Sequence, residues 1–138
     1  MPTIENIQTG DSASFSKTIT ETDITLYAAV SCDTNPAHLN DTYAKNSSFG
    51  GRIAHGMLSA GLISCVLGTK LPGPGTIYLG QDLKFVKPVY IGDTLTATVT
   101  VAERFPEKNR LKLDTVVTNQ NGKTVISGSA VVMPPTES

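Results

Sequence analysis

Hydrophobic and polar positions alternate near the start of the chain and then change to helical spacing. The alternation over 13–19 predicts a short strand. Thr20, followed by Asp23, has the pattern of a helix N-terminus. The apolar residues after it recur every three or four positions, so we expect the first helix to continue to about Cys32.

Three further segments complete the first half of the chain. Asn40 can cap a second, short helix that ends near Ala44. The stretch 47–52 contains two adjacent glycines and is predicted to be a loop. From Gly56 to about Gly68 nearly every position is apolar or small. Because a helix that is apolar on all sides is a buried one, we predict that this segment is the central helix of the core.

After residue 76 the pattern changes to alternation, which predicts strands. The expected strands cover 77–85, 95–101, 111–117 and 125–133. The first has a break at Gly80–Gln81, and Asn121–Gly122 favours a tight hairpin turn because both residues tolerate positive φ. The order of elements predicts an α+β fold, a single domain over 1–138 in which an antiparallel sheet wraps around one long helix.

Composition limits the function classes. The net charge is −1 and no basic patch stands out, so we expect no nucleic-acid partner. The longest apolar stretch, 57–71, is too short and too rich in Gly and Ser to span a bilayer, and the N-terminus lacks the features of a signal peptide. We therefore expect no membrane association. Cys32 and Cys65 lack metal-site spacing and are expected to be reduced, which fits a cytoplasmic protein.

The segment from Asp33 to His38 carries a reactive pair of side chains. Pro36 has no amide proton and disfavours helical geometry in Asn35, so a helix cannot continue through this segment. The backbone must turn, and we expect the carboxylate of Asp33 and the imidazole of His38 to converge on one point. Such a pair can divide general acid and general base catalysis between its two members.

Gly56 begins the apolar helix and supplies a second kind of chemistry. The first turn of a helix has amide protons without partners in the helix, and the helix dipole adds partial positive charge there. Without a side chain at Gly56, another molecule can approach the amide closely. This arrangement would suit a thioester carbonyl that becomes enolate-like during a reaction. Hydration of the neighbouring double bond needs a base, an acid and an enolate stabiliser, and His38, Asp33 and Gly56 are suitable by type.

Four motifs together resemble one family. They are Asp33–His38, His55–Leu58, Ile77–Gln81 and Phe85–Asp93. From about Ile7 to Met133 the chain is similar to the MaoC-like, (R)-specific enoyl-CoA hydratases. The resemblance implies a hot-dog fold and a homodimer with the active site near the subunit interface. It also implies no metal and no redox cofactor, coenzyme A being part of the substrate.

The resemblance assigns roles to individual residues. Asp33 and His38 are the hydratase pair, which holds and activates water at C3 of a trans-2-enoyl thioester. We expect His38 to take the proton of the water and protonated Asp33 to deliver one to C2, although the sequence leaves the division of acid and base open. Gly56 matches the backbone donor to the thioester oxygen, and Asn35 is expected to fix the turn. The residues that resemblance assigns to the acyl pocket are Ser64, Leu67 and Val132.

Other reactive residues receive simpler interpretations. His55 precedes the apolar helix and is expected to be a cap or support rather than a catalytic residue. A metal site that would gather His55 with Asp33, His38 and Cys32 lacks a ligand pair of known spacing, so none is expected. Arg52, Lys84 and Lys87 could meet the phosphates of coenzyme A, but solvated surface charge is the better default. 

The sequence therefore favours an enoyl-CoA hydratase, a hydro-lyase that converts trans-2-enoyl-CoA reversibly into (R)-3-hydroxyacyl-CoA in fatty-acid metabolism or in the supply of polyhydroxyalkanoate synthesis. Two alternatives stay open. A hot-dog acyl-CoA thioesterase could use the same helix N-terminus for hydrolysis and would release free coenzyme A. A non-catalytic acyl-CoA binding module would need the pocket but not both Asp33 and His38.

Overall fold

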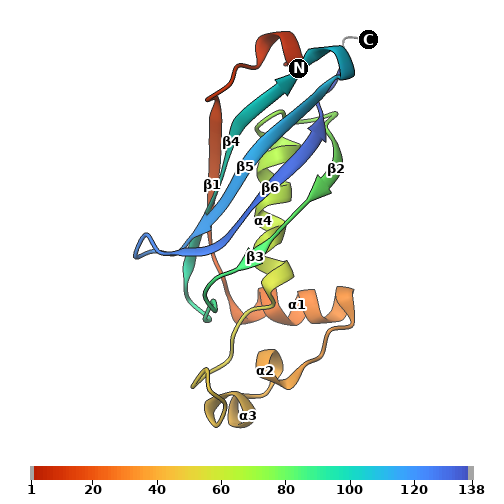
Figure 1. The fold of residues 1–138 in the computed structure, drawn as a ribbon. Helices are drawn as coiled ribbons and strands as arrows, with labels where there is room; N and C mark the ends of the chain where they lie inside the picture. The colour runs from red at the N-terminus through yellow and green to blue at the C-terminus, as the bar shows by residue number, and fades with distance from the viewer. Residues whose placement is uncertain (1, 137–138) are drawn as a thin grey trace.

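The computed structural model describes residues 2–136, and a six-stranded antiparallel sheet forms its main layer (Figure 1). The strands are β1 (Ser12–Thr18), β2 (Ile77–Gln81), β3 (Lys84–Phe85), β4 (Thr94–Phe105), β5 (Arg110–Thr118) and β6 (Thr124–Met133). They lie in the order β1-β4-β5-β6-β2, and β3 also pairs with β6. The helices are α1 (Glu21–Ser31), α2 (Pro36–Leu39), α3 (Asp41–Lys45) and α4 (Gly56–Thr69), with single 3₁₀ turns at η1 (Ile4–Asn6) and η2 (Pro106–Lys108).

The sheet wraps along one side of α4, as the order of elements predicts (Figure 1). Alternate residues of β4 and β5 point toward the helix, so that Leu95 and Leu113 are fully buried. They belong to the same hydrophobic core as Ile63 of α4. Leu67 and Val132, which resemblance assigned to an acyl pocket, are also members of this core.

The prediction that α4 is buried on all sides is wrong for the single chain. Met57, Gly61, Ser64 and Gly68 are exposed, and their spacing of three or four residues places them on one stripe of the helix. The sheet covers only the opposite side of α4, where the buried Ile63 and its neighbours lie. The composition of α4 is apolar all round, but the described part of the chain supplies a cover for one side only.

The short helices lie at one end of the molecule, below the sheet and beside the start of α4 (Figure 1). The expected cap of α1 is confirmed, because the Thr20 side chain accepts a hydrogen bond from the amide of Asp23 at 3.1 Å, and the Asp23 carboxylate accepts one from the amide of Thr20 at 2.9 Å. Asn40 likewise caps α3 and accepts the amide of Tyr43 at 2.9 Å. These caps position the segment that connects α1 to α4.

Turns between the strands follow the sequence in part. The expected break near Gly80 is present as a register shift between β2 and β6, and the chain re-enters the sheet as β3. The predicted tight turn at Asn121–Gly122 is longer, because pairing resumes only between Thr118 and Thr124. Gly122 has a φ of 72°, but Asn121 does not adopt positive φ. Within residues 2–136, the helices are all too short or too polar to cross a membrane.

Candidate active site

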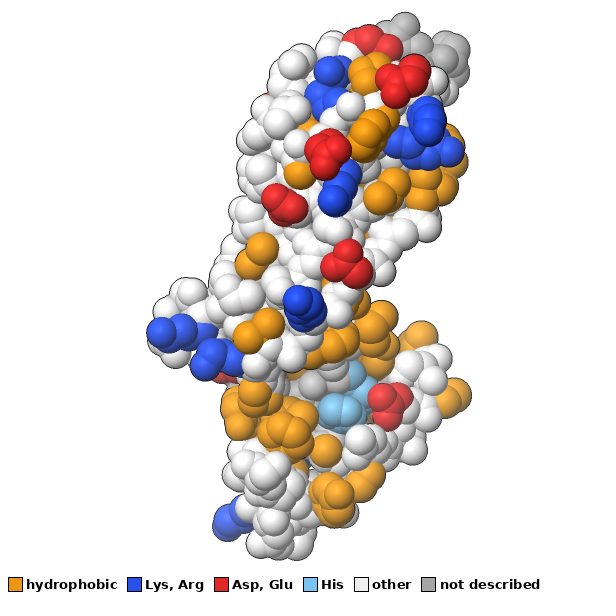
Figure 2. Space-filling model, in the orientation of Figure 1, with side chains coloured by type: hydrophobic (Ala, Val, Ile, Leu, Met, Phe, Trp, Pro, Cys, Tyr) orange, Lys and Arg blue, Asp and Glu red, His pale blue; other side chains and the backbone are white. Residues whose placement is uncertain are grey.

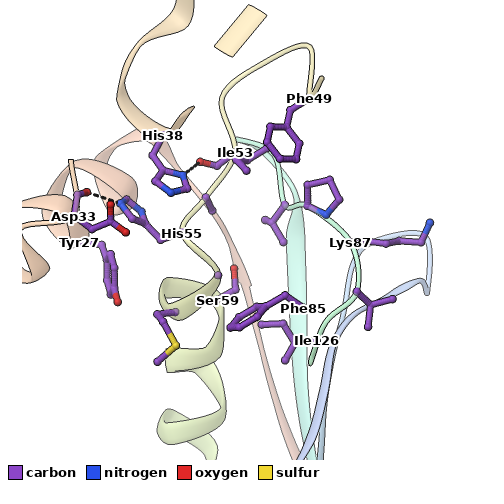
Figure 3. A pocket seen from close by; sticks show the side chains of 16 residues that line it. Tyr27, Asp33, His38, Phe49, Ile53, His55, Ser59, Phe85, Lys87 and Ile126 are labelled. Atoms are coloured by element: carbon purple, nitrogen blue, oxygen red, sulfur yellow. Dashed lines mark hydrogen bonds between the residues drawn. The ribbon is translucent and has the colours of Figure 1, made fainter. Parts of the chain in front are cut away.

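A cavity of about 480 Å³ opens where α2, the start of α4 and the segment after β3 meet (Figure 3). Asp33, His38 and Gly56 line it, together with apolar side chains such as Phe85 and Ile126. Figure 2 shows histidine side chains in a hollow of the surface, beside an acidic side chain and among hydrophobic ones. The three residues that the sequence singled out for reaction chemistry therefore share one cavity.

The end of α1 positions Asp33. Cys32 closes the helix in the left-handed region with a φ of 64°, and its amide bonds to the carbonyl of Ala28 at 2.9 Å. A residue of this conformation turns the chain away from the helix axis. Asp33 thus leaves the helix, and its carboxylate accepts the amide of Asn35 at 3.2 Å while staying exposed.

Pro36 begins α2, a helix of four residues that carries His38. The sequence predicted that no helix continues through this segment, and α1 does end before it. However, proline fits the first position of a new helix, where no amide bond is needed. Asn35 caps this new helix and accepts the amide of Ala37 at 3.0 Å, so Asn35 fixes the turn as expected.

The hydrogen bond of the His38 ring defines its tautomer. Nδ1 lies 2.7 Å from the carbonyl oxygen of Ile53. Because a carbonyl can only accept, Nδ1 must carry the proton, and in the neutral ring Nε2 is left with a free lone pair. The imidazole is 8% exposed and lines the cavity. This geometry gives His38 the form that a general base requires.

His55 contacts both Asp33 and His38. Its ring stacks on that of His38 with 3.9 Å between centroids, and Nε2 donates to the backbone carbonyl of Asp33 at 2.9 Å (Figure 3). It makes no side-chain cap to α4, although it occupies the N-cap position. His55 therefore connects the segments that carry Asp33 and His38, which agrees with the supporting position expected from the sequence.

Gly56 presents the first amide of α4 to the cavity. No side chain caps this end of the helix, so its first amide protons are open to a ligand. A Cβ atom at position 56 would lie 2.6 Å from the ring of Phe85, so a side chain there would require the exposed ring to move. Glycine leaves the ring in place and adds no side chain over the amide.

Arg52 is a site residue that the sequence did not reveal. It was expected to be solvated, but it is 8% exposed, and its Nε donates to the carbonyl of His38 at 2.7 Å. Its guanidinium also pairs with Glu21 of α1 at 2.8 Å. Arg52 therefore holds α2 against α1. The contact joins residues 14 positions apart, and no local spacing indicates it.

Asp33, His38 and His55 are also the group, among residues 2–136, whose potential metal-binding atoms lie together, all within 4.8 Å of one another. The two imidazoles are stacked, with 30° between their planes. The structure therefore brings together three of the four residues that a metal site would gather.

The three residues assigned to the acyl pocket lie elsewhere in the single chain. Leu67 and Val132 are in the hydrophobic core, and Ser64 is on the exposed stripe of α4. None of them lines the cavity that contains Asp33 and His38. Their assignment came from resemblance, and the structure of one chain does not bring them to the reactive groups.

The chain is similar to known proteins over most of its length. The family model of the MaoC-like domain matches residues 5–126. An (R)-specific enoyl-CoA hydratase of Rhodospirillum rubrum is 60% identical over 131 residues, which cover 95% of this chain and 90% of the relative.

Solved structures extend the likeness to the fold. The unliganded R-hydratase PhaJ1 of Pseudomonas aeruginosa has a TM-score of 0.93 at 49% identity, covering 98% of this chain and 86% of its own. The (R)-hydratase of A. caviae involved in PHA biosynthesis also has a TM-score of 0.93, at 40% identity, covering 95% and 99%. The expected hot-dog fold is confirmed by these neighbours, and the chain belongs to the MaoC-like domain family.

Proposed function

We propose that this protein is an (R)-specific enoyl-CoA hydratase, a hydro-lyase that adds water reversibly to trans-2-enoyl-CoA. The observation that carries the proposal is that Asp33, His38 and Gly56, the first residue of α4, line one cavity. The relatives named as (R)-specific hydratases support the substrate class and the stereochemistry of the product.

The hydration can be written with these three groups. A water molecule between Asp33 and His38 gives a proton to His38 Nε2, and its oxygen bonds to C3 of the enoyl group. The electrons of the double bond move toward the thioester, whose oxygen accepts a hydrogen bond from the amide of Gly56. His38 passes this proton through water to the Asp33 carboxylate. The Asp33 carboxyl then delivers it to C2, which restores both groups.

This reaction involves no net oxidation or reduction, so we propose that it uses no redox cofactor. We also propose that Asp33, His38 and Gly56 carry out the hydration without a metal. Coenzyme A enters and leaves as part of the substrate. The product, an (R)-3-hydroxyacyl-CoA, is the kind of compound that polyhydroxyalkanoate synthesis consumes. The role of the A. caviae hydratase in PHA biosynthesis supports the same use here.

We also propose that the protein acts as a homodimer. The exposed stripe of α4 includes Met57, whose side chain is half exposed, and Gly61. At the edge of the sheet, β2 exposes Ile77, Tyr78 and Leu79 in sequence, and an uncovered edge strand with apolar side chains favours pairing with another chain. Ser64 lies on this stripe, so it would line an acyl pocket only where a second copy of the chain covers the stripe. Its assignment to the acyl pocket therefore rests on the proposed dimer.

Cys32 and Cys65 are both unpaired, which supports a reducing compartment, and we propose the cytoplasm.

The activity itself is tested by the loss of enoyl-thioester absorbance with crotonyl-CoA and longer enoyl-CoAs. The product should be oxidised by an (R)-specific coupling enzyme while the thioester stays intact. Release of free coenzyme A without hydration would indicate a thioesterase, and binding without either reaction would indicate a binding module.

A further inference from the structure

Ser59 of α4 has a buried hydroxyl without a hydrogen-bond partner. The residue is 1% exposed, and its Oγ is among the buried side-chain atoms of residues 2–136 that have no partner. A serine inside a helix commonly bonds to the carbonyl four residues earlier, here that of His55. That carbonyl instead accepts the backbone amides of Leu58 at 3.1 Å and Ser59 at 3.3 Å. Because buried hydroxyls are nearly always paired, this one requires an explanation.

The position of Ser59 relates its hydroxyl to Gly56. Both residues line the same cavity, and a separation of three places them on one face of α4. Helical side chains lean toward the N-terminus, so the hydroxyl lies over the turn that begins with Gly56. Figure 3 shows Ser59 pointing from the helix into the cavity, next to Phe85. The hydroxyl and the open amide therefore face the same part of the cavity.

The ring of Phe85 lies against this region of the cavity. Its ring lies directly against Gly56, as the distance of 2.6 Å to a hypothetical Cβ shows. The same side chain is 54% exposed and belongs to a strand of only two residues. An incoming thioester can displace the ring toward solvent and reach the Gly56 amide and the Ser59 hydroxyl.

We propose that the hydroxyl of Ser59 donates a second hydrogen bond to the thioester oxygen that the amide of Gly56 binds. The inference rests on the proposed hydratase function and adds a substrate-contacting residue to it. When water adds at C3, negative charge develops on this oxygen, and two preorganised donors stabilise it better than one. Ser59 keeps its proton throughout and forms no covalent bond.

Kinetics of Ser59→Ala test the proposal, with Thr69→Ala as the control, because it removes an exposed hydroxyl at the other end of the same helix, away from the cavity. Removing one oxyanion donor lowers kcat by about 10²–10³-fold in other enzymes, and here we expect about tenfold or more in kcat/KM for crotonyl-CoA because Gly56 remains. Thr69→Ala should stay within about twofold of the wild type. Ser59→Ala should unfold at the same temperature as the wild type or higher, because it removes an unpaired buried hydroxyl. Ser59→Cys, which keeps the size but donates weakly, should behave like Ser59→Ala in kinetics.

The carbonyl stretching frequency gives a direct readout of the contact. With ¹³C-carbonyl butyryl-CoA bound, infrared difference spectra should show a lower frequency in the wild type than in Ser59→Ala. An unchanged frequency, or wild-type kcat/KM in Ser59→Ala, would overturn the proposal. Absence of hydration by the wild-type protein would contradict the proposed function instead, and the frequency of the bound saturated thioester would still decide whether Ser59 contacts the oxygen.

Discussion

The core between α4 and the sheet differs from the segment 32–55 in what holds it together. In the core, fully buried side chains such as Ile63 and Leu113 contact many apolar neighbours. The stabilisation is not directional, so it is spread over the whole layer. A substitution at one core position therefore lowers the free energy of unfolding without changing the orientation of a reactive group.

Single hydrogen bonds hold the segment 32–55. His38 bonds to the carbonyl of Ile53, His55 bonds to that of Asp33, and Arg52 bonds to that of His38. Each of these bonds orients one reactive group. The comparison teaches that stability and activity depend on different parts of this small domain, and variants can separate them.

The largest effect is expected from the reactive pair itself. Asp33→Asn and His38→Ala should each lower kcat for hydration by about 10²–10⁴-fold, because each removes a proton-transfer group. Asp33 is exposed, so its variant should keep the wild-type unfolding free energy within about 0.5 kcal/mol. Steady-state kinetics and urea unfolding on the same samples make the test. Full activity in both variants would show that the site is elsewhere.

A core variant should show the opposite behaviour. Leu113→Ala removes a fully buried side chain and should lower the free energy of unfolding by about 2–5 kcal/mol. The kcat per folded molecule should stay near that of the wild type, because no bond in the segment 32–55 is lost. Denaturant unfolding combined with active-site titration provides both numbers. A fall in kcat as large as that of His38→Ala would break the separation between the two regions.

Arg52 combines features of both regions, since its side chain is buried and it also orients the segment 32–55. Arg52→Lys keeps the positive charge but loses the Nε donor to the carbonyl of His38. We expect kcat to fall about tenfold with little change in KM, because the reactive ring moves while substrate binding is kept. Glu21→Gln is the control, as it removes only the charge of an exposed partner of Arg52 and leaves the second partner, Asp41 at 3.7 Å, in place. The Arg52 contact would have no role in positioning if Arg52→Lys had the kcat of Glu21→Gln.

The smallest effect is expected at the cap of α1. Thr20→Ala should lower the unfolding free energy by about 1 kcal/mol and leave kcat unchanged, whereas Thr22→Ala on the same exposed turn should change neither.

Burial tends to raise the pKa of Asp23, but hydrogen bonds from the Thr20 backbone and from Lys17 outweigh it and lower the pKa. Because the pKa of Asp23 is lower in the folded state, its ionised carboxylate stabilises the fold at pH values above the carboxyl's ordinary pKa. This stabilisation is lost as the pH falls through the pKa of the folded state. Unfolding of Asp23→Ala should therefore differ from the wild type at neutral pH and converge with it in acid.

The sequence predicted the parts of this structure that depend on local pattern. Alternation located β4 and β5, and a glycine after His55 located the open end of α4. Pro36 correctly indicated a turn between Asp33 and His38. These features are encoded within a few residues, so spacing and residue type are sufficient to find them.

The features that the sequence did not predict either join distant residues or depend on which side of α4 the sheet leaves uncovered. The bond from His55 to Asp33 spans 22 positions, and the burial of Arg52 depends on α1. The exposed stripe of α4 carries one methionine and small residues, which are also common on buried helices, so composition alone does not show that this side lacks a cover. Only the arrangement in space shows that Ser59 faces the cavity while Ser64 does not.

A double-variant cycle at Asp33 and His38 tests most directly whether both residues act on one water molecule. The hydration rate of Asp33→Asn combined with His38→Ala is compared with the rates of the two single variants under saturating crotonyl-CoA. The account predicts that the double variant is nearly as active as the slower single variant, because either change already disables the shared water. A double variant whose loss equals the product of the two single losses would show that the residues act independently and would contradict the account.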